Sequence, residues 1–214
     1  MSETQLREDI CRFAASFFER GLTGGSSGNL SARTEDGGLL VTPTGSSFGT
    51  LDPARISRLD AAGTLIDGDP PTKEMPLHTA FYDTRAAAGA VVHLHSTYCV
   101  AISMLPEIDP DNVLPPITPY SIMRLGKVKL LPYFRPGDAA MGEAVRGLAG
   151  KRSAVLLANH GPVVAAKTLE AAVYAMEELE ETARLALLTR GMAPIGLNEA
   201  QIRDLVETFD VEWD

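Results

Sequence analysis

Residues 90–97 read AVVHLHST, an apolar run that ends in two histidines. A short apolar run bounded by polar residues is typical of a buried strand, so we predict a strand from Ala90 to His95. Side chains alternate across a strand, which places His93 and His95 on one face and Val92 and Leu94 on the other. Two imidazoles about 7 Å apart along a strand can bind one metal ion.

A third histidine also follows an apolar run. His160 comes after the predicted strand Ala154–Leu157, in the turn before a second predicted strand, Val163–Ala166. Three neutral imidazoles leave one position of a tetrahedral ion open, which is the pattern of catalytic zinc. Pairs of the form His-x-His also occur as ordinary strand histidines, so the residues alone leave both interpretations open. The fourth histidine, His78, lies near aromatic residues in a predicted helix, and we predict that it packs there and binds no metal.

Helices and strands alternate along the rest of the chain. Periodicity predicts further strands at residues 29–33, 39–41 and 128–133, with a short hairpin over 60–66. It predicts helices at residues 4–20, 75–85, 97–104, 138–148, 168–190 and 199–209. The acidic run on the longest helix, 177–181, is predicted to be a solvated face or a subunit contact rather than a metal site. No repeat or linker interrupts the chain, so we predict one domain over residues 1–214.

Composition excludes several classes of protein. The sequence is 45% hydrophobic and 22% charged, as in soluble globular proteins. Its net charge of -9 gives it no general attraction to nucleic acid or to anionic membranes. No stretch reaches the roughly 18 apolar residues that a membrane span requires, and the charged start shows no signal peptide. The spacing of Cys11 and Cys99 predicts reduced thiols, so we expect a cytoplasmic protein.

Three segments carry groups that bind phosphate. They are residues 23–28, 42–47 and 72–73, and any one of them alone is typical of an ordinary turn. Backbone N–H groups, hydroxyls and the ammonium of Lys73 are the groups that hold a phosphate in proteins. Glu74 follows at the start of a predicted helix, where the helix dipole also favours an anion. If the segments meet, a phosphate, a metal ion and a carboxylate share one pocket.

Taken together, five segments resemble the class II aldolase/adducin family in order and spacing. They are residues 27–33 (SGNLSAR), 42–45 (TPTG), 73–74 (KE), 92–95 (VHLH) and 159–161 (NHG), and the resemblance spans nearly the whole chain. It implies a single α/β domain with a central, mainly antiparallel β-sheet flanked by helices. It also implies a homotetramer with active sites between subunits.

The same resemblance implies a site and its chemistry. It places one zinc ion, or another divalent metal, on His93, His95 and His160, with Glu74 as a metal-facing acid/base. Tyr120, in the predicted loop 118–121, falls where the aldolases of the family place a tyrosine that reaches a neighbouring subunit's site; an aromatic residue at an interface is the equal alternative. The positions that correspond to the phosphate-binding residues of the family are Gly28, Asn29, Thr44, Gly45, Thr72 and Lys73.

The residues before Glu74 separate two activities within the family. Aldolases carry paired serines there, whereas this chain has Thr72-Lys73. The strings 71–78 (PTKEMPLH), 94–97 (LHST) and 157–162 (LANHGP) look most like the 3-oxo-tetronate 4-phosphate decarboxylases of the family. That resemblance implies loss of carbon dioxide through a zinc-stabilised enediolate to give dihydroxyacetone phosphate, with Lys73 as a cation for the substrate. The alternatives are a sugar-phosphate aldolase of the fuculose or ribulose phosphate type, a 4-epimerase, and a non-catalytic adducin-like interaction domain.

Overall fold

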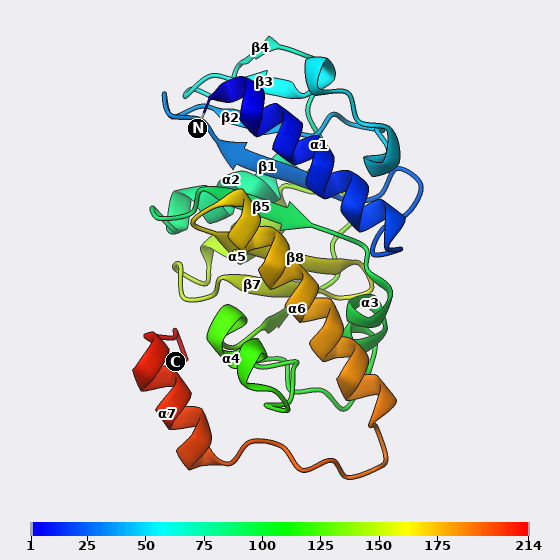
Figure 1. Cartoon of the computed structure of the whole chain (residues 1–214), viewed down its shortest axis with the longest axis vertical. Coiled ribbons are helices and arrows are strands. Elements are labelled where there is room, and N and C mark those ends of the chain that lie inside the picture. Colours follow the sequence, from blue (N-terminus) through cyan, green and yellow to red (C-terminus); the bar gives the residue numbers. More distant parts are fainter. Residues whose placement is uncertain (1, 214) are drawn as a thin grey trace.

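The computed structural model describes residues 2–213 and contains one eight-stranded sheet with helices on both faces (Figure 1). In spatial order the strands run β4-β3-β2-β1-β5-β8-β7-β6. Among them only β6 and β7 pair in parallel, so the mainly antiparallel α/β fold predicted from the sequence is confirmed. The strands are β1 Asn29–Arg33, β2 Leu39–Val41, β3 Ser57–Leu59, β4 Leu65–Asp67, β5 Ala90–His93, β6 Lys129–Leu131, β7 Ala154–Leu157 and β8 Gly161–Ala166.

Most strands lie where the sequence predicts them. β1, β2 and β7 begin and end at the predicted residues. A hairpin of β3 and β4 is present, but it begins at Ser57, three residues before the predicted start, so β3 lies outside the predicted range 60–66. β5 ends at His93, two residues before its predicted end, because the chain turns at His95 to begin a helix at Thr97. His95 therefore lies beyond the strand, although the backbone N–H of Leu94 still donates to the carbonyl of Pro162 at 3.2 Å.

The predicted helices are present, and one α-helix among the described residues was not predicted. The α-helices are α1 Glu3–Glu19, α2 Met75–Thr84, α3 Thr97–Ser103, α4 Pro119–Leu125, α5 Ala140–Arg146, α6 Leu169–Leu188 and α7 Glu199–Phe209. Helix α4 replaces the predicted loop around Tyr120. Its signal is the pair Thr118-Pro119, an N-cap whose hydroxyl accepts from the N–H of Ser121, followed by proline at the first position. No helix within residues 2–213 is long and apolar enough to cross a membrane.

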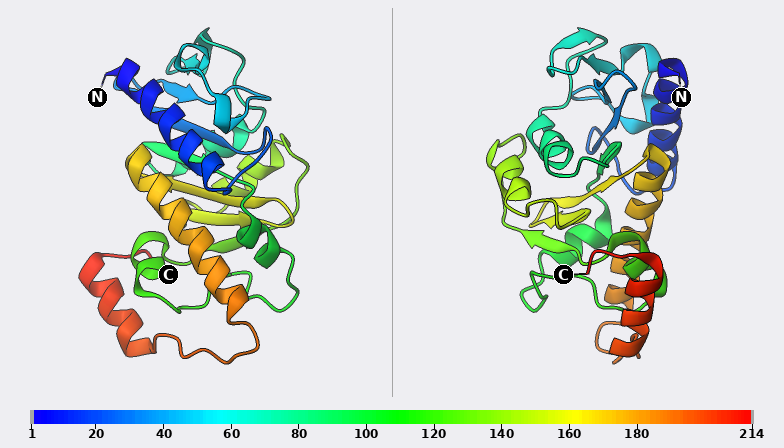
Figure 2. Two further views of the ribbon diagram at one scale, coloured as in Figure 1. Left: turned by 45° about the vertical axis from the view of Figure 1, so that its right-hand side comes forward. Right: turned by 90° about the vertical axis from the view of Figure 1, so that its left-hand side faces the viewer.

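The helices form one layer on each face of the sheet (Figure 2). Helices α1, α3 and α6 pack with one set of strand side chains, which includes Leu30 and Val92. Helices α2 and α5 pack with the other set, which includes Val91. Neighbouring residues of one strand thus enter different cores, as the alternation of side chains along a strand requires. The candidate ligands lie where the α2 layer meets the ends of β5 and β8.

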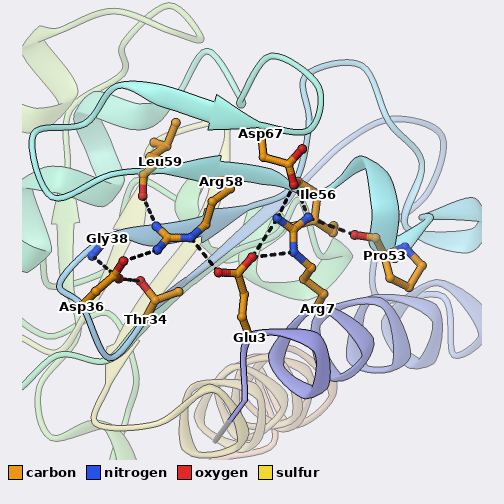
Figure 3. Close-up of polar contacts among 10 residues, drawn as sticks. All are labelled: Glu3, Arg7, Thr34, Asp36, Gly38, Pro53, Ile56, Arg58, Leu59 and Asp67. Atoms are coloured by element: carbon orange, nitrogen blue, oxygen red, sulfur yellow. Dashed lines mark hydrogen bonds and ion pairs between the residues drawn. The ribbon is translucent and has the colours of Figure 1, made fainter.

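Two arginines join α1 to the hairpin of β3 and β4 (Figure 3). Arg58 of β3 donates from Nε to the carboxylate of Glu3 at 2.9 Å. Arg7 of α1 donates to the carbonyl of Ile56 at 2.8 Å and to the carboxylate of Asp67 at 2.9 Å. Both guanidinium groups are nearly buried, so these contacts hold the hairpin end of the sheet against α1.

Candidate active site

Four side chains of the kinds that bind metals converge where β5 ends and β8 begins. His93 is the last residue of β5, His95 follows two residues later, and His160 directly precedes β8. Glu74 is the N-cap residue of α2. Because β5 and β8 are antiparallel neighbours with His93 opposite Val163, the end of one strand lies beside the start of the other. One ligand atom from each of the four residues lies within 4.8 Å of the others.

Two glycines allow the backbone to pass close to the histidines. Gly28 has a φ of +84°, and a Cβ atom there would lie 3.0 Å from the carbonyl oxygen of His93. A Cβ atom on Gly161 would lie 2.1 Å from the carbonyl oxygen of Leu94, a distance that no real side chain tolerates. Larger residues at these two positions would displace the strand end that carries the candidate ligands.

The histidine rings direct their Nε2 atoms toward one another. Nε2 of His95 lies 3.1 Å from Nε2 of both His93 and His160. Nδ1 of His93 donates to the carbonyl of Pro162 at 2.8 Å, and since a neutral imidazole carries one N–H, its Nε2 is then a bare acceptor. Glu74 completes the group. Its Oε2 lies 3.4 Å from Nε2 of His93, and its Oε1 lies 3.4 Å from Nε2 of His160.

The electrostatics of the group fit a divalent cation. Burial lowers the pKa of His93 well below its usual range, and the charges that His95 and His160 would carry lower it further. Burial is also the main cause of the lowered pKa values of His95 and His160, so all three rings present the neutral form that metals bind. Oε1 of Glu74 is buried without a hydrogen-bond partner among the described residues. Converging lone pairs and an unpaired carboxylate oxygen are compatible with a bound cation and unfavourable without one.

Known proteins are similar to this chain in sequence and in fold. The family model described as "Class II Aldolase and Adducin N-terminal domain" matches residues 8–187. The chain belongs to this family. A 3-oxo-tetronate 4-phosphate decarboxylase from Escherichia coli K12 is 50% identical over 186 residues, which cover 87% of this chain and 88% of that protein. An L-fuculose phosphate aldolase from the same strain is 32% identical over 214 residues, which cover 98% of this chain and 96% of that protein. The crystal structure of a putative aldolase/epimerase/decarboxylase from Escherichia coli has a TM-score of 0.93 at 47% identity, covering 95% of this chain and 98% of that one.

The metal dependence of the family is relevant to the four converging residues. The class II aldolase family is typically dependent on a divalent metal, and within residues 2–213 Glu74, His93, His95 and His160 form the one group of three or more side chains that could hold such an ion. His78 is not part of that group. It is fully buried, and its ring nitrogens bind to other side chains of the fold.

Two of the three segments predicted to bind phosphate, 42–47 and 72–73, meet beside Glu74. The loop 42–45 runs alongside the loop 70–73, joined by two backbone hydrogen bonds of 3.0 and 3.2 Å. The start of β1 joins them, because the N–H of Leu30 donates to the hydroxyl of Thr42 at 3.0 Å. The exposed residues of this cluster are Thr44, Gly45 and Lys73.

Two of the predicted site residues, Asn29 and Tyr120, are neither among the converging ligands nor among the exposed loop residues. The amide of Asn29 is buried and donates from Nδ2 to Oε2 of Glu74 at 2.7 Å, so this side chain contacts the acid/base group. Tyr120 lies on α4 with 55% of its surface exposed, and its ring centroid is 5.9 Å from Cζ of Arg124. No contact described between residues 2 and 213 joins Tyr120 to the histidines, so a role for it at the site requires a second subunit.

One buried carboxylate near the site was not predicted from the sequence. Glu180 belongs to the run predicted to be solvated or at a subunit contact, yet it is 9% exposed. Its oxygens accept from the hydroxyl of Ser96 at 2.6 Å and from the N–H groups of Tyr98 at 2.8 Å and Cys99 at 2.9 Å. The signal was present, because position 180 falls on the inward stripe of α6 with Met176 and Ala183.

Proposed function

We propose that this chain removes carbon dioxide from 3-oxo-tetronate 4-phosphate and releases dihydroxyacetone phosphate. The observation that carries the proposal is the unpaired Oε1 of Glu74, a buried acid/base group beside three converging Nε2 atoms. The choice of substrate is supported by similarity, since the decarboxylase is 50% identical to this chain and the aldolase 32%.

Residues of the chain would perform distinct parts of this reaction. The C1–C2 bond of the β-keto acid breaks and releases carbon dioxide, and its electron pair moves to C2 and the ketone oxygen at C3. When bound by His93, His95 and His160, a divalent metal such as zinc supplies Lewis-acid polarisation of that oxygen. Glu74, or a water molecule that it orients, then delivers a proton to C2 from the side of Oε1. Protonation gives dihydroxyacetone phosphate.

The loops beside Glu74 would hold the substrate in position. We assign phosphate binding to the exposed backbone and hydroxyl groups of Thr44 and Gly45, together with Gly28, Asn29 and Thr72 of the adjoining segments. Lys73 is exposed and directly precedes Glu74, so its ammonium can reach an anionic group of a bound substrate. Fixing both ends of the substrate would hold its reacting carbon beside Glu74.

We propose a homotetramer in the cytoplasm, with Tyr120 of one subunit completing the site of another. Support comes from the exposure of Tyr120, an aromatic residue on a helix that packs against α6 and α7. Sedimentation equilibrium should give four times the mass of 22.9 kDa. A monomeric, active protein would exclude this role for Tyr120.

The first experiment compares substrates on protein of measured metal content. Purified protein is incubated with 3-oxo-tetronate 4-phosphate, fuculose 1-phosphate or ribulose 1-phosphate, and dihydroxyacetone phosphate and carbon dioxide are measured separately. Both products from the first substrate alone support the decarboxylase. Dihydroxyacetone phosphate from a sugar phosphate without carbon dioxide would make the chain an aldolase, and a folded protein that binds no metal would favour the interaction domain.

Replacement of Lys73 tests the proposed contact with the substrate. Lys73→Ala should lower kcat/KM about 10- to 100-fold, because a hydrogen bond to a charged group contributes about 1.5–3 kcal/mol. Lys151→Ala, at another exposed lysine, is the matched control and should leave kcat/KM unchanged. Equal kinetic constants for both variants would remove Lys73 from the site.

A further inference from the structure

Glu74 and four polar side chains behind it form a buried ladder between α2 and β1. Glu74, His78 and Tyr82 are spaced four residues apart on one face of the helix, and Asn29 and Ser31 are spaced two apart on one face of the strand. Four helical residues rise about 6 Å, and two strand residues rise about 6.7 Å. The two elements therefore present polar groups at nearly the same interval, and each group of one meets a group of the other.

The hydrogen bonds form a continuous chain along this ladder. Nδ2 of Asn29 lies 2.7 Å from Oε2 of Glu74, and Oδ1 of Asn29 lies 2.5 Å from Nε2 of His78. Nδ1 of His78 lies 2.7 Å from the hydroxyl of Ser31, which lies 2.8 Å from the hydroxyl of Tyr82. All five residues are less than 9% exposed, so their polar groups depend mainly on one another for hydrogen bonds.

The chemistry of the amide fixes the direction of the chain. A carboxylate only accepts, so the NH2 group of Asn29 must face Glu74 and its oxygen must face His78. Nε2 of His78 is then the donor, and its Nδ1 must accept the hydroxyl proton of Ser31. Burial lowers the pKa of His78 to about 3, with a smaller lowering from His93, so the ring is neutral and carries a single N–H. Every donor in this series of hydrogen bonds therefore points toward Glu74.

We propose that His78 is a positioning residue for Glu74, acting through the amide of Asn29. Its Nε2–H holds the amide so that Nδ2 engages Oε2 of Glu74, and only Oε1 stays available for the metal ion or the substrate. This inference deepens the proposed function, since it explains how one face of the acid/base group is kept free. The packing role predicted from the sequence describes where His78 lies, and the ladder adds what its ring does.

The tautomer of His78 is the direct test. In zinc-loaded protein with 15N-labelled histidine, His78 should show the Nε2–H tautomer, assigned by the loss of its signals in His78→Gln. The Nδ1–H tautomer would overturn the proposal, because Nε2 could then not donate to Asn29. This spectrum does not depend on any enzymatic activity.

A matched pair of hydroxyl deletions tests the effect on the site. Ser31→Ala removes the donor that sets the tautomer of His78, whereas Tyr82→Phe removes a hydroxyl one step further along and leaves the Ser31–His78 bond in place. Ser31→Ala should weaken zinc binding about 10-fold in a chelator competition and lower kcat about 10-fold, while KM stays nearly constant. Tyr82→Phe should change each value by less than about twofold, and equal effects of the two variants would overturn the proposal.

The conservative variant separates positioning from packing. Gln at position 78 can place an amide NH2 near the position of Nε2, so His78→Gln should retain most of the zinc affinity and kcat that His78→Leu loses. If His78→Leu does not fold, the pair Ser31→Ala and Tyr82→Phe still decides. Absence of decarboxylation by the wild-type protein would refute the proposed function alone, since the tautomer and the zinc affinities would still test the ladder.

Discussion

Glu74 and Glu180 are the two buried glutamates among the described residues, and they differ in what surrounds their oxygens. Both oxygens of Glu180 are occupied, with three donors from Ser96 and the first turn of α3. Glu74 has one oxygen bound by Asn29 and the other without a partner. A buried carboxylate that the fold satisfies completely serves the structure, whereas one left half satisfied is available to a ligand.

The largest expected effect is on activity and concerns Glu74. Glu74→Gln keeps the size of the side chain and removes the group that carries the proton, so kcat should fall about 10²- to 10⁴-fold. Its free energy of unfolding, measured in urea, should change little, because Oε1 of Glu74 has no partner to lose. Glu181→Gln, at an exposed position of α6, is the control for activity. A Glu74→Gln enzyme with normal kcat would falsify the assignment of Glu74 as the acid/base.

The second expected effect is on stability and concerns Glu180. Glu180→Ala leaves the donors of Ser96, Tyr98 and Cys99 without their acceptor, so the free energy of unfolding should fall by about 3 kcal/mol. Glu181→Ala, one residue along and exposed, should change it by less than about 0.5 kcal/mol. Urea unfolding of the metal-free proteins gives both values, and equal values would mean that Glu180 is no more structural than its neighbour.

The third effect tests whether a ligand completes the half-satisfied group. Zinc at about 100 times its dissociation constant should stabilise the folded protein by about 2.7 kcal/mol, if it binds only the folded state. The gain should disappear in His95→Ala and after addition of a chelator, while Glu180→Gln should retain part of it. Urea midpoints in zinc-buffered solution measure these differences. A wild-type protein that gains nothing from any divalent metal would contradict the site.

The smallest effect concerns the thiol beside Glu180. Burial raises the pKa of Cys99 well above its usual range, and the negative charge of Glu180 raises it further. Since the thiolate is the reactive form, Cys99 should resist iodoacetamide at pH 8 in the folded protein. Glu180→Gln removes the charge, so alkylation of Cys99, followed by mass spectrometry, should become a few times faster. An unchanged rate would show that burial alone protects the thiol.

Much of the fold was predictable because its strands are short apolar runs with clear ends. β1, β2 and β7 follow directly from that pattern, and the helical periodicity predicted both ends of α7. The histidines were found because His-x-His and His160 both follow buried runs. Helix α4 was missed although its signal, the capping pair Thr118-Pro119, is present in the sequence.

The rest of the site depends on contacts between distant segments. Glu180 and Ser96 are 84 residues apart, and Asn29 and Glu74 are 45 apart, so no local pattern joins them. The exposure of Tyr120 in one chain leaves its predicted role dependent on assembly. The sequence does indicate part of the ladder, since Glu74, His78 and Tyr82 recur every four residues. His78 was interpreted as a packing residue because its neighbours in the sequence are aromatic.

The ladder between α2 and β1 has a consequence for folding errors. Asn29 and Ser31 face α2 only in the pairing observed between β1 and β5, where Ser31 lies opposite Val91. A slip of one residue would turn both side chains to the face covered by α1 and α6, because strand side chains alternate. A misregistered chain would then lack the support of Glu74, so metal retention would report whether the centre of the sheet has formed correctly. Apo protein recovered after refolding would be enriched in such chains, and metal affinity could be used to separate them.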